Sequence, residues 1–523
     1  MRTQTAILMR TLSLLLAFSI PVLAQTSAQQ PTRSVEDTTP VRLAPAVAKY
    51  VKYDTAKNTL WLEHVRVIDG TGAAPVEDAT VILLNGKIAA VIPPRHMEAN
   101  EGHMATWSCT DCPPALHIDL TGRTIFPGLV GMHNHLFYLT RPNTDVTGAS
   151  DPPVVVPEMS FSSPRLYLGA GVTTMRTTGS VEPYEDLNLR DAIDKGMLPG
   201  PHIDVTGPYL EGPGAFALEM HQLKDAADAK ATVDFWADQG VTSFKAYMNI
   251  TRAELKAAID EAHKRGLKIT GHLCSVTYPE AVELGIDNLE HGFYVNTQLD
   301  PGKQPDICPR TQGIPTLTKM TPDTPEAKAL IALLVSHHVA ITSTLPVFQS
   351  QDPEHLRFDP RILEAMSPNT REAYLITRNN ELMRAAANPK AAAERAQVLK
   401  NDMAMERAFY EAGGLLLAGP DPTGDGGTLP GYADQRELEL LVQAGFTPLE
   451  AIKIGTLNGA TFEGRADHIG TIAEGKNADL VVVRGDPSKN INDIENTELV
   501  FKDGVAFDSQ ALLDSVKGRY GQY

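Results

Sequence analysis

The stretch that decides the fold is residues 241–273, VTSFKAYMNITRAELKAAIDEAHKRGLKITGHL. Its parts are a β-rich run from Val241 to Tyr247, a helical pattern from Arg252 to Arg265, and a second β-rich run from Lys268 to Leu273. Thr251 is the expected N-cap of the helix, and Glu254 completes a capping box with it. A strand, a helix and a strand in this order predict a parallel βαβ unit.

The same alternation of strand and helix extends from Ile125 to about Thr456 and predicts a parallel α/β architecture. Antiparallel sheet is predicted on both sides of it, from Thr59 to Ile92 and again at Ala478 to Arg484 and Leu499 to Phe507, where Gly-containing turns separate short β-rich runs. The economical interpretation is a distorted (β/α)8 TIM barrel at residues 125–456. A small β-sandwich domain would be built from both ends of the chain, residues 48–124 and 457–523.

One gap between two barrel strands is longer than the others. Residues 346–413 are rich in Ala, Glu, Arg and Met at helical spacing, with Pro353, Pro360 and Pro368 as punctuation. Two interpretations fit this segment, an inserted helical cap or simply long barrel helices. A cap over the C-terminal mouth would matter, because the active sites of such barrels lie there.

The composition narrows the class of protein. The chain has 523 residues, and 64 acidic against 46 basic side chains give a formal charge of −18, which argues against nucleic acid as a partner. With 42% hydrophobic and 21% charged residues, the chain is expected to form a globular protein of more than one domain. Intrinsic disorder and a membrane-spanning architecture are disfavoured.

The N-terminus has the pattern of a cleaved signal peptide. Residues 1–24 carry Arg2 and Arg10, an apolar run from Leu12, and the ending Val22-Leu23-Ala24. An apolar run of about ten residues is too short to span a bilayer, which takes roughly 20. We therefore expect an exported protein, periplasmic or secreted, without stable membrane insertion. Because residues 1–24 hold two arginines and no acid, the mature chain has 499 residues and a charge of −20. Residues 25–47 are expected to be a polar leader and linker. The mature protein is expected to form a homo-oligomer.

The four cysteines suit an exported protein. Cys109 and Cys112, in Cys-Thr-Asp-Cys, can pair as a loop disulfide, since a zinc knuckle would need a second pair nearby and the sequence has none. Cys274 lies at the end of an apolar strand and is expected to be buried rather than reactive.

Histidines and one aspartate close several of the predicted strands. The segment IFPGLVGMHNHLFY, Ile125 to Tyr138, presents His133 and His135 two residues apart, so both face the same side of a strand. His272 and His291 end two short β-like runs one βα unit apart, and Asp421 ends the run LLLAGPD. Such a set suits zinc, manganese or a related ion with open positions for substrate. Because these groups would be costly to bury without a partner, the pattern predicts a metal site.

Lys245 lies in the apolar strand of the βαβ unit, on the same side as Val241 and Ser243. A protonated amine cannot bind a metal. An amine carboxylated by carbon dioxide would supply two oxygens that bridge two ions. The alternative is an ordinary lysine paired with an acid at the end of the barrel, and the residues alone leave both open.

The strand-closing residues, together with the tail GTIAEGKNADLVVV at Gly470 to Val483, resemble the amidohydrolase superfamily over roughly residues 55–510. The chain looks most similar to the imidazolonepropionase-like and Xaa-Pro dipeptidase branch of secreted bacterial members. GVTTMR at Gly171 to Arg176 and ELELLVQAG at Glu437 to Gly445 add to this similarity. The resemblance implies a binuclear centre with His133, His135 and Asp421 on one metal, His272 and His291 on the other, and carboxylated Lys245 bridging both.

The same resemblance implies two divalent ions, with zinc favoured over manganese, cobalt or iron. It also implies a bridging hydroxide as the nucleophile, with Asp421 as the general acid/base that takes its proton and delivers it to the leaving nitrogen. Tyr247, His221 and Arg176 are candidates for orienting the substrate. Each also has a structural interpretation: a tyrosine that lines the barrel, a histidine on a helix surface and an arginine paired in the core.

Two segments depart from the family pattern. Asp421 follows Pro420, where Thr or Ser is usual, and the proline removes one backbone donor. GPYLEGPG at Gly207 to Gly214 lacks the Gly-Gly-His that is usual in imidazolonepropionase-like dipeptidases. Glu211 in this segment resembles a metal-ligating glutamate of the sugar-amide deacetylases in the same superfamily. Those enzymes lack the bridging lysine, so we expect Glu211 to be a loop residue or to lie behind the ligands.

The expected function is that of a secreted metal-dependent amidohydrolase, which cleaves an amide bond in a peptide or an N-acyl amino acid. The alternative is hydrolysis of a cyclic amide, a lactone or another ester by the same binuclear site. A non-catalytic binding protein of the same fold is the hypothesis from another class. It is disfavoured because every expected ligand position is filled.

Overall fold

A computed structural model describes residues 37, 39–94, 107–140, 154–217, 219–352, 356–423 and 427–521. The expected signal peptide at residues 1–24, most of the leader and linker, and Pro353 lie outside these residues. None of the described helices combines the length and the apolar character that crossing a bilayer requires.

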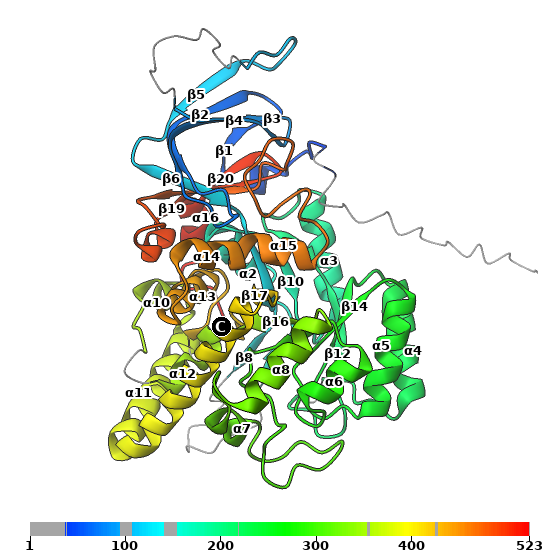
Figure 1. The fold of residues 1–523 in the computed structure, drawn as a ribbon. Coiled ribbons are helices and arrows are strands. Elements are labelled where there is room, and N and C mark those ends of the chain that lie inside the picture. Colours follow the sequence, from blue (N-terminus) through cyan, green and yellow to red (C-terminus); the bar gives the residue numbers. More distant parts are fainter. Residues whose placement is uncertain are drawn as a thin grey trace, which may run out of the picture. The chain divides into compact units, whose positions relative to one another are not determined.

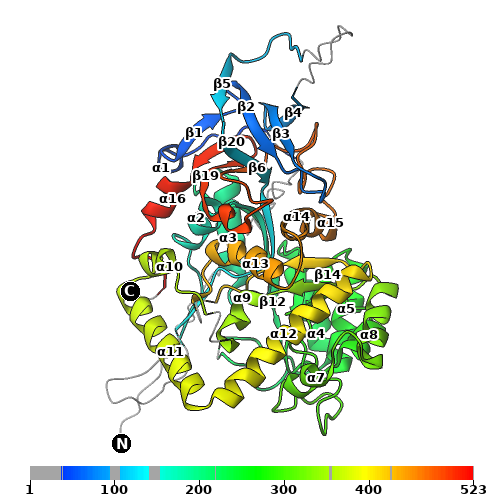
Figure 2. The ribbon, with the colours of Figure 1, turned by 60° about the vertical axis from the view of Figure 1, so that its left-hand side comes forward.

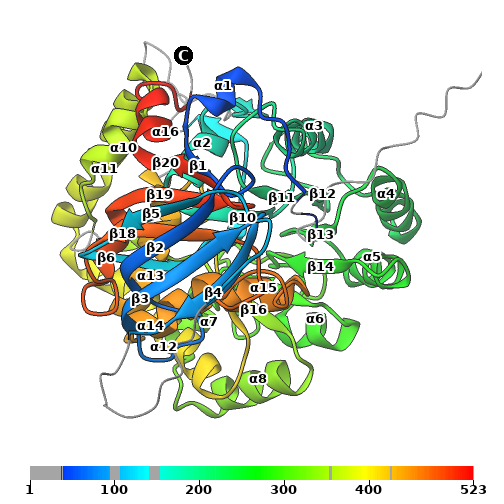
Figure 3. The same cartoon turned by 90° about the horizontal axis from the view of Figure 1, so that it is seen from above.

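Segments from both ends of the chain build one sheet. Within the described residues its nine strands pair in the order β1-β20-β19-β18-β6-β2-β3-β4, with β5 on β2. The strands are β1 (Val51–Asp54), β2 (Thr59–Val67), β3 (Val76–Leu84), β4 (Lys87–Ile92), β5 (Ala115–Asp119), β6 (Arg123–Pro127), β18 (Leu480–Arg484), β19 (Thr497–Lys502) and β20 (Val505–Asp508). Figures 1 and 3 show the blue N-terminal strands beside the red C-terminal ones.

Alternating side chains of these strands enclose one apolar core, as a period of two residues requires. Leu60, Leu62, Val81, Leu480 and Val482 are all fully buried in it. The sheet folds over onto itself, because the Ile88 N–H donates to the Lys476 carbonyl and the Ala478 N–H to the Gly86 carbonyl. The predicted β-sandwich made from both ends of the chain is thus confirmed.

Most strands between these two segments run parallel and form the barrel. Within the described residues they make a sheet of three strands, β11-β10-β7, and a sheet of six, β12-β13-β14-β15-β16-β17. Only Val205 separates β11 from β12, so the two serve as one barrel strand. The Asp421 N–H donates to the His133 carbonyl at 3.0 Å, where the end of β17 meets β7. The strands therefore form the predicted distorted (β/α)8 barrel.

The barrel strands are β7 (Leu129–Asn134), β10 (Val172–Thr177), β11 (His202–Asp204), β12 (Thr206–Leu210), β13 (Ser243–Ala246), β14 (Lys268–Gly271), β15 (Asn288–Glu290), β16 (Ala340–Ser343) and β17 (Leu416–Ala418). The helices between them are α2 (Ser163–Gly169), α3 (Pro183–Asp194), α4 (Ala226–Asp238), α5 (Arg252–Lys264), α6 (Tyr278–Leu284), α7 (Ile314–Lys319), α8 (Pro325–Ser336) and α12 (Pro389–Glu411). Viewed from above, α3, α4, α5, α6 and α8 lie around the outside of the strands (Figure 3).

Shorter elements complete the chain. They are α1 (Pro45–Ala48), the strand pair β8 (Tyr138–Thr140) and β9 (Val154–Val156), α9 (Leu345–Phe348), α10 (Pro360–Ala365), α11 (Pro368–Ala387), α13 (Tyr432–Gln443), α14 (Pro448–Lys453), α15 (Gly459–Phe462) and α16 (Ser509–Ser515).

The βαβ unit at residues 241–273 is confirmed as β13, α5 and β14. The Glu254 N–H donates to Thr251 Oγ1 at 3.3 Å, and the Thr251 N–H donates to Glu254 Oε2 at 2.8 Å. This reciprocal cap satisfies donors that the first helical turn leaves without partners and contributes about 1 kcal/mol. Leu255, Ala258 and Ile259 of α5 are buried. Local sequence and tertiary packing therefore favour the same unit.

The barrel begins later than predicted. Residues 125–127 belong to β6 and pair with β18, so the first barrel strand begins only at Leu129. A Cβ on the intervening Gly128 would lie 2.0 Å from Thr173 Oγ1, so the crossing from sheet to barrel requires glycine. The sequence pattern missed this boundary because two apolar strands follow each other without a polar break.

The segment at residues 346–413 is helical. It contains both a long barrel helix and inserted helices, so each of the two interpretations describes only part of it. Helix α12 takes the position of the barrel helix between β16 and β17, where Asn401 donates to the Leu317 carbonyl of α7 at 2.9 Å. Helices α10 and α11 are additional (Figure 2). They pack beside the C-terminal segment, since the Ser367 N–H donates to the Tyr520 carbonyl and Tyr374 shares an apolar cluster with Tyr520.

Two disulfides join the four cysteines. Cys109 pairs with Cys112, as the sequence predicted. Cys274 is buried as expected, but it pairs with Cys308, a bond that no sequence pattern predicted. The partners are 34 positions apart, and only the folding of the loop after β15 brings them together.

Candidate metal centre

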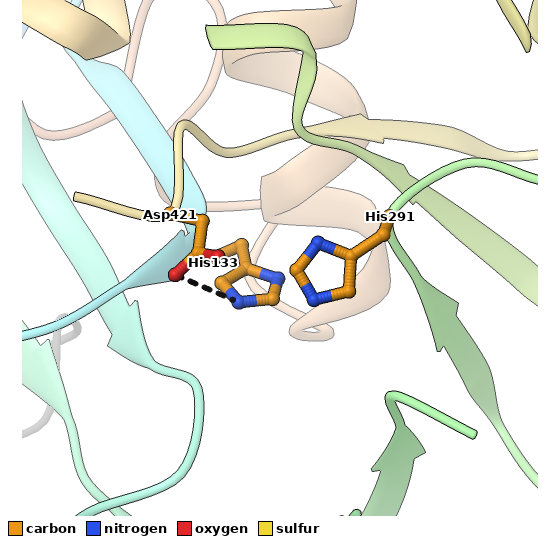
Figure 4. Close-up of side chains that lie close together, drawn as sticks. All are labelled: His133, His291 and Asp421. Atoms are coloured by element: carbon orange, nitrogen blue, oxygen red, sulfur yellow. Dashed lines mark ion pairs between the residues drawn. The ribbon is translucent and has the colours of Figure 1, made fainter. Parts of the chain in front are cut away.

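The six predicted ligands gather at the C-terminal ends of the barrel strands. His133 lies in β7 one residue before its end, and Lys245 lies in β13. The other four follow the ends of β7, β14, β15 and β17: His135, His272, His291 and Asp421. Lys245 Nζ lies 3.1 Å from His133 Nε2, and Asp421 Oδ1 lies 3.0 Å from His135 Nε2. The rings of His272 and His291 are 4.3 Å apart. Figure 4 shows the side chains of His133, His291 and Asp421 close together, with Asp421 on a loop.

Two of these residues have an unusual backbone conformation. The φ angles of His291 and Asp421 are 67° and 54°, in the left-handed region that most side chains avoid. Such conformations cost on the order of 1–3 kcal/mol each and cluster at functional sites. The chain approaches β7 closely just before Asp421 and helps to hold it, because a Cβ on Gly419 would lie 2.3 Å from the backbone nitrogen of His133. The strained backbone at these two positions therefore directs both side chains toward the other candidate ligands.

The imidazoles are neutral at physiological pH. Burial, and next the positive Lys245, lower the pKa of His133 to about 4 and that of His272 to about 3. Burial also lowers the pKa of His135, and it holds the pKa of His291 well below the usual range. A neutral imidazole offers a lone pair, which is the form that binds a metal.

An unsatisfied buried atom also fits a metal. His291 Nε2 is buried and has no hydrogen-bond partner among the described residues. Leaving such an atom unpaired costs about 1–3 kcal/mol. His133, His291 and Asp421 each offer one ligand atom, and these atoms lie within 4.8 Å of one another. The donor set therefore suits a divalent ion with nitrogen and oxygen ligands.

The two non-imidazole residues are also tuned by their surroundings. Burial alone would raise the pKa of the Asp421 carboxyl, but His133 and His135 outweigh burial, so this pKa lies well below its usual range and the carboxylate is ionised. Burial lowers the pKa of Lys245 to about 8, against the opposing effect of Asp421 and Glu290. Far more of the Lys245 amine is therefore neutral at pH 7 than in an exposed lysine.

Glu290 and Thr344 hold two of the ligand rings, and neither residue was predicted from the sequence. His133 Nδ1 lies 2.7 Å from Glu290 Oε2, and His291 Nδ1 lies 2.8 Å from Thr344 Oγ1. A carboxylate at Nδ1 fixes the tautomer of His133 and leaves its Nε2 lone pair for a metal. The available signal was a glutamate at the end of an apolar strand, directly before His291.

Arg176 is buried beside Glu290. Its side chain is 1% exposed, and it donates to the Met132 carbonyl and to Glu290 Oε1, the latter at 2.8 Å. Burial alone would raise the pKa of Glu290, but His133 and Arg176 outweigh burial and lower it to about 2. Arg176 thus positions the partner of a ligand, and the substrate-orienting role expected for it is not supported.

The other candidates occupy different surroundings. The side chain of His221 is 46% exposed and pairs with Asp228 at 3.2 Å rather than with a candidate ligand. The half-buried Tyr247 does lie beside them, with its ring 4.7 Å from that of His272. Glu211 Oε1 accepts the backbone N–H groups of Gly212 and Asn249 at 2.8 and 2.7 Å. Glu211 therefore ties two loop segments together.

Replacing Glu290 with glutamine is expected to weaken metal binding by about 10- to 100-fold, because the ring of His133 loses the carboxylate that orients it. Zinc affinity measured by competition with a chromophoric chelator checks this. His221→Gln is the matched control and should leave the affinity unchanged. Equal affinities for Glu290→Gln and the unaltered protein would contradict the orienting role.

Comparisons with known proteins agree with this geometry. The pattern of a family described as "Amidohydrolase family" matches residues 124–506. An uncharacterized protein of Mycobacterium tuberculosis is 23% identical over 398 residues, covering 74% of this chain and 86% of that protein. A Xaa-Pro dipeptidase with bound methionine in the active site superimposes with a TM-score of 0.60 at 19% identity, covering 86% of this chain and 100% of that chain. Bottromycin amidohydrolase superimposes with a TM-score of 0.62 at 20% identity, covering 90% of this chain and 94% of that chain.

Proposed function

The chain belongs to the amidohydrolase family and is a hydrolase acting on carbon–nitrogen bonds. From this premise we propose that it cleaves the amide bond of a short peptide or an N-acyl amino acid in a metal-dependent reaction. One observation carries the proposal: neutral imidazoles, a lysine with a lowered pKa and an ionised aspartate converge at the C-terminal end of one barrel. Active sites of such barrels lie at that end.

We assign His133, His135 and Asp421 to one ion and His272 and His291 to a second, with Lys245, carboxylated, between the two. Zinc is the preferred ion, and manganese, cobalt or iron are alternatives. Divalent ions bound there supply a water of lowered pKa and polarise the substrate carbonyl. The unpartnered His291 Nε2 and the neutral state of the imidazoles support this assignment.

Asp421 is proposed as the group that moves protons. Its carboxylate is ionised and lies within 3.0 Å of His135 Nε2 and 3.6 Å of His133 Nε2. A carboxylate at this position accepts the proton of the attacking water and returns it to the leaving nitrogen. Its side chain is 14% exposed, so it can contact substrate, and Tyr247 beside His272 is placed to orient the substrate.

The similar structures guide the choice of substrate class. A Xaa-Pro dipeptidase and an amidohydrolase share this fold, and both names denote cleavage of amide bonds. A cyclic amide, a lactone or another ester is the second candidate, because the same electrophilic carbonyl would meet the same residues. We also propose that the protein is exported, on the N-terminal pattern of residues 1–24. Two disulfides in the described chain support an oxidising compartment.

A substrate panel tests the proposal. We expect the purified protein to hydrolyse dipeptides or N-acyl amino acids faster than lactams, lactones and simple esters. Dialysis against a chelator should abolish turnover, and zinc or manganese should restore it. Faster turnover of lactones or esters would favour the second candidate. If no amide or ester is cleaved at full metal occupancy, the protein is a binding protein of the same fold.

A further inference from the structure

We propose a second metal site, separate from the candidate centre, where the barrel meets the β domain. It consists of His202, Asp479 and Asp503, which each offer one ligand atom, and these atoms lie within 4.8 Å of one another. His202 begins the barrel strand β11, whereas Asp479 directly precedes β18 and Asp503 directly follows β19. The inference does not rest on the proposed function.

One carboxylate oxygen in this cluster needs a partner. Asp479 is 5% exposed, and its Oδ1 accepts the Asp503 N–H at 2.6 Å, but its Oδ2 has no hydrogen-bond partner among the described residues. His202 is also buried, and its Nε2 lies 3.1 Å from Asp503 Oδ1. A simple His–Asp pair would explain the second contact and would leave Asp479 Oδ2 unsatisfied. A buried ion shared by all three residues accounts for both.

The charge of the cluster also favours a cation. Lys502 is the ammonium that faces it, with Nζ 3.9 Å from Asp503 Oδ2, and the same lysine also acts on Asp194. A distance of 3.9 Å is too long for a hydrogen bond. One positive charge leaves the two carboxylates Asp479 and Asp503 with net negative charge, and a divalent cation offsets it.

The donor atoms indicate which cation fits. One imidazole nitrogen and two carboxylate oxygens suit zinc or manganese, whereas calcium and magnesium prefer oxygen alone. Ligand atoms of tetrahedral zinc lie roughly 3.3 Å apart, close to the 3.1 Å between His202 Nε2 and Asp503 Oδ1. A cavity of about 50 Å³ adjoins the cluster and is lined in part by Asp194, Lys502 and Asp503. It has room for a water beside Asp503.

An ion at this place would fasten the β domain to the barrel. It would join the barrel strand β11 to residues 479 and 503 of the β domain, which lie 277 and 301 positions after His202 in the chain. The ion would act on stability, because none of the three residues is among the candidate catalytic ligands.

Counting bound metal tests this site. Metal-free full-length protein is titrated with zinc sulfate in a calorimeter, and bound zinc is counted by elemental analysis after gel filtration. We expect His202→Gln and Asp479→Asn each to bind one equivalent fewer than the unaltered protein. His263→Gln, which removes an exposed His–Asp pair with Nε2 2.9 Å from Asp287, is the matched control and should lose none.

Equal zinc counts in the unaltered protein and both variants would overturn the site. A failure of the proposed catalytic centre looks different, since it lowers the count equally in every variant and keeps the difference of one equivalent. Should both variants fail to fold, anomalous diffraction at the zinc edge from crystals of the unaltered protein decides. A peak between His202 and Asp503 is expected, and its absence overturns the site.

Discussion

Replacing Asp421 with asparagine is expected to lower kcat by about 10³-fold, because the amide cannot accept the proton of the attacking water or return it to the leaving nitrogen. Asparagine is also a weaker metal ligand, so the variant should bind less metal on the His133 and His135 side. The fold should persist, because the substitution changes only the side-chain contact with His135. The backbone bond from the N–H of residue 421 to the His133 carbonyl remains. Steady-state kinetics on the best substrate of the panel measures the effect.

The control for Asp421 is a second aspartate with the same change in charge. Asp323 is exposed and far from the ligands in sequence, and Asp323→Asn should retain normal kcat and KM. A melting temperature and a circular dichroism spectrum like those of the unaltered protein would show that Asp421→Asn is folded. Retention of more than a tenth of kcat in folded, metal-loaded Asp421→Asn would rule out the proton-transfer role.

Replacing Lys245 with alanine is expected to remove most bound metal and with it nearly all activity, a loss on the order of 10³-fold. The alanine side chain offers no oxygen, so the two proposed ions lose the ligand that they share. Lys245→Arg should behave in the same way, because a guanidinium keeps the charge but remains protonated and does not take up carbon dioxide. Elemental analysis of the purified variants, together with turnover, measures both effects.

Lys268 provides the matched control for Lys245. It begins β14, the strand next to β13, and burial lowers its pKa as well, but its Nζ donates to the Phe462 carbonyl away from the ligands. Lys268→Ala should keep its full metal content. Near-full metal occupancy and activity in Lys245→Ala would eliminate the bridging role and leave Lys245 as a buried lysine close to His133.

The sequence predicted the features that local pattern encodes. The period of apolar residues and the capping box of Thr251 and Glu254 are local, and both appear in the structure at the predicted positions. The barrel and the β domain followed from the order of such segments. The candidate ligands were found because the carboxyl ends of parallel strands meet at one end of a barrel, so residues that close strands become neighbours.

Contacts between distant segments could not be predicted in this way. Glu290 looks like one charge in a buried strand, and only its contact with the Nδ1 of His133, 157 positions earlier, shows that it orients a ligand. Arg176 looked equally suited to a substrate and to the core until its bonds to Glu290 and the Met132 carbonyl were known. The pairing of Cys274 with Cys308 depends on a loop path that carries no local signal.

The sequence by itself determined the order of strands and helices, the two-part β domain and the residues that close the barrel strands. These features depend on the hydrophobic period, the helix caps and the strand ends, which involve residues close together in the chain. Only the tertiary structure decided which of these side chains face one another, where the barrel begins and what the segment at residues 346–413 packs against. Those properties depend on burial and on distances between segments hundreds of residues apart. The cluster of His202, Asp479 and Asp503 is the clearest case, since its members come from a barrel strand and from the ends of two strands of the β domain.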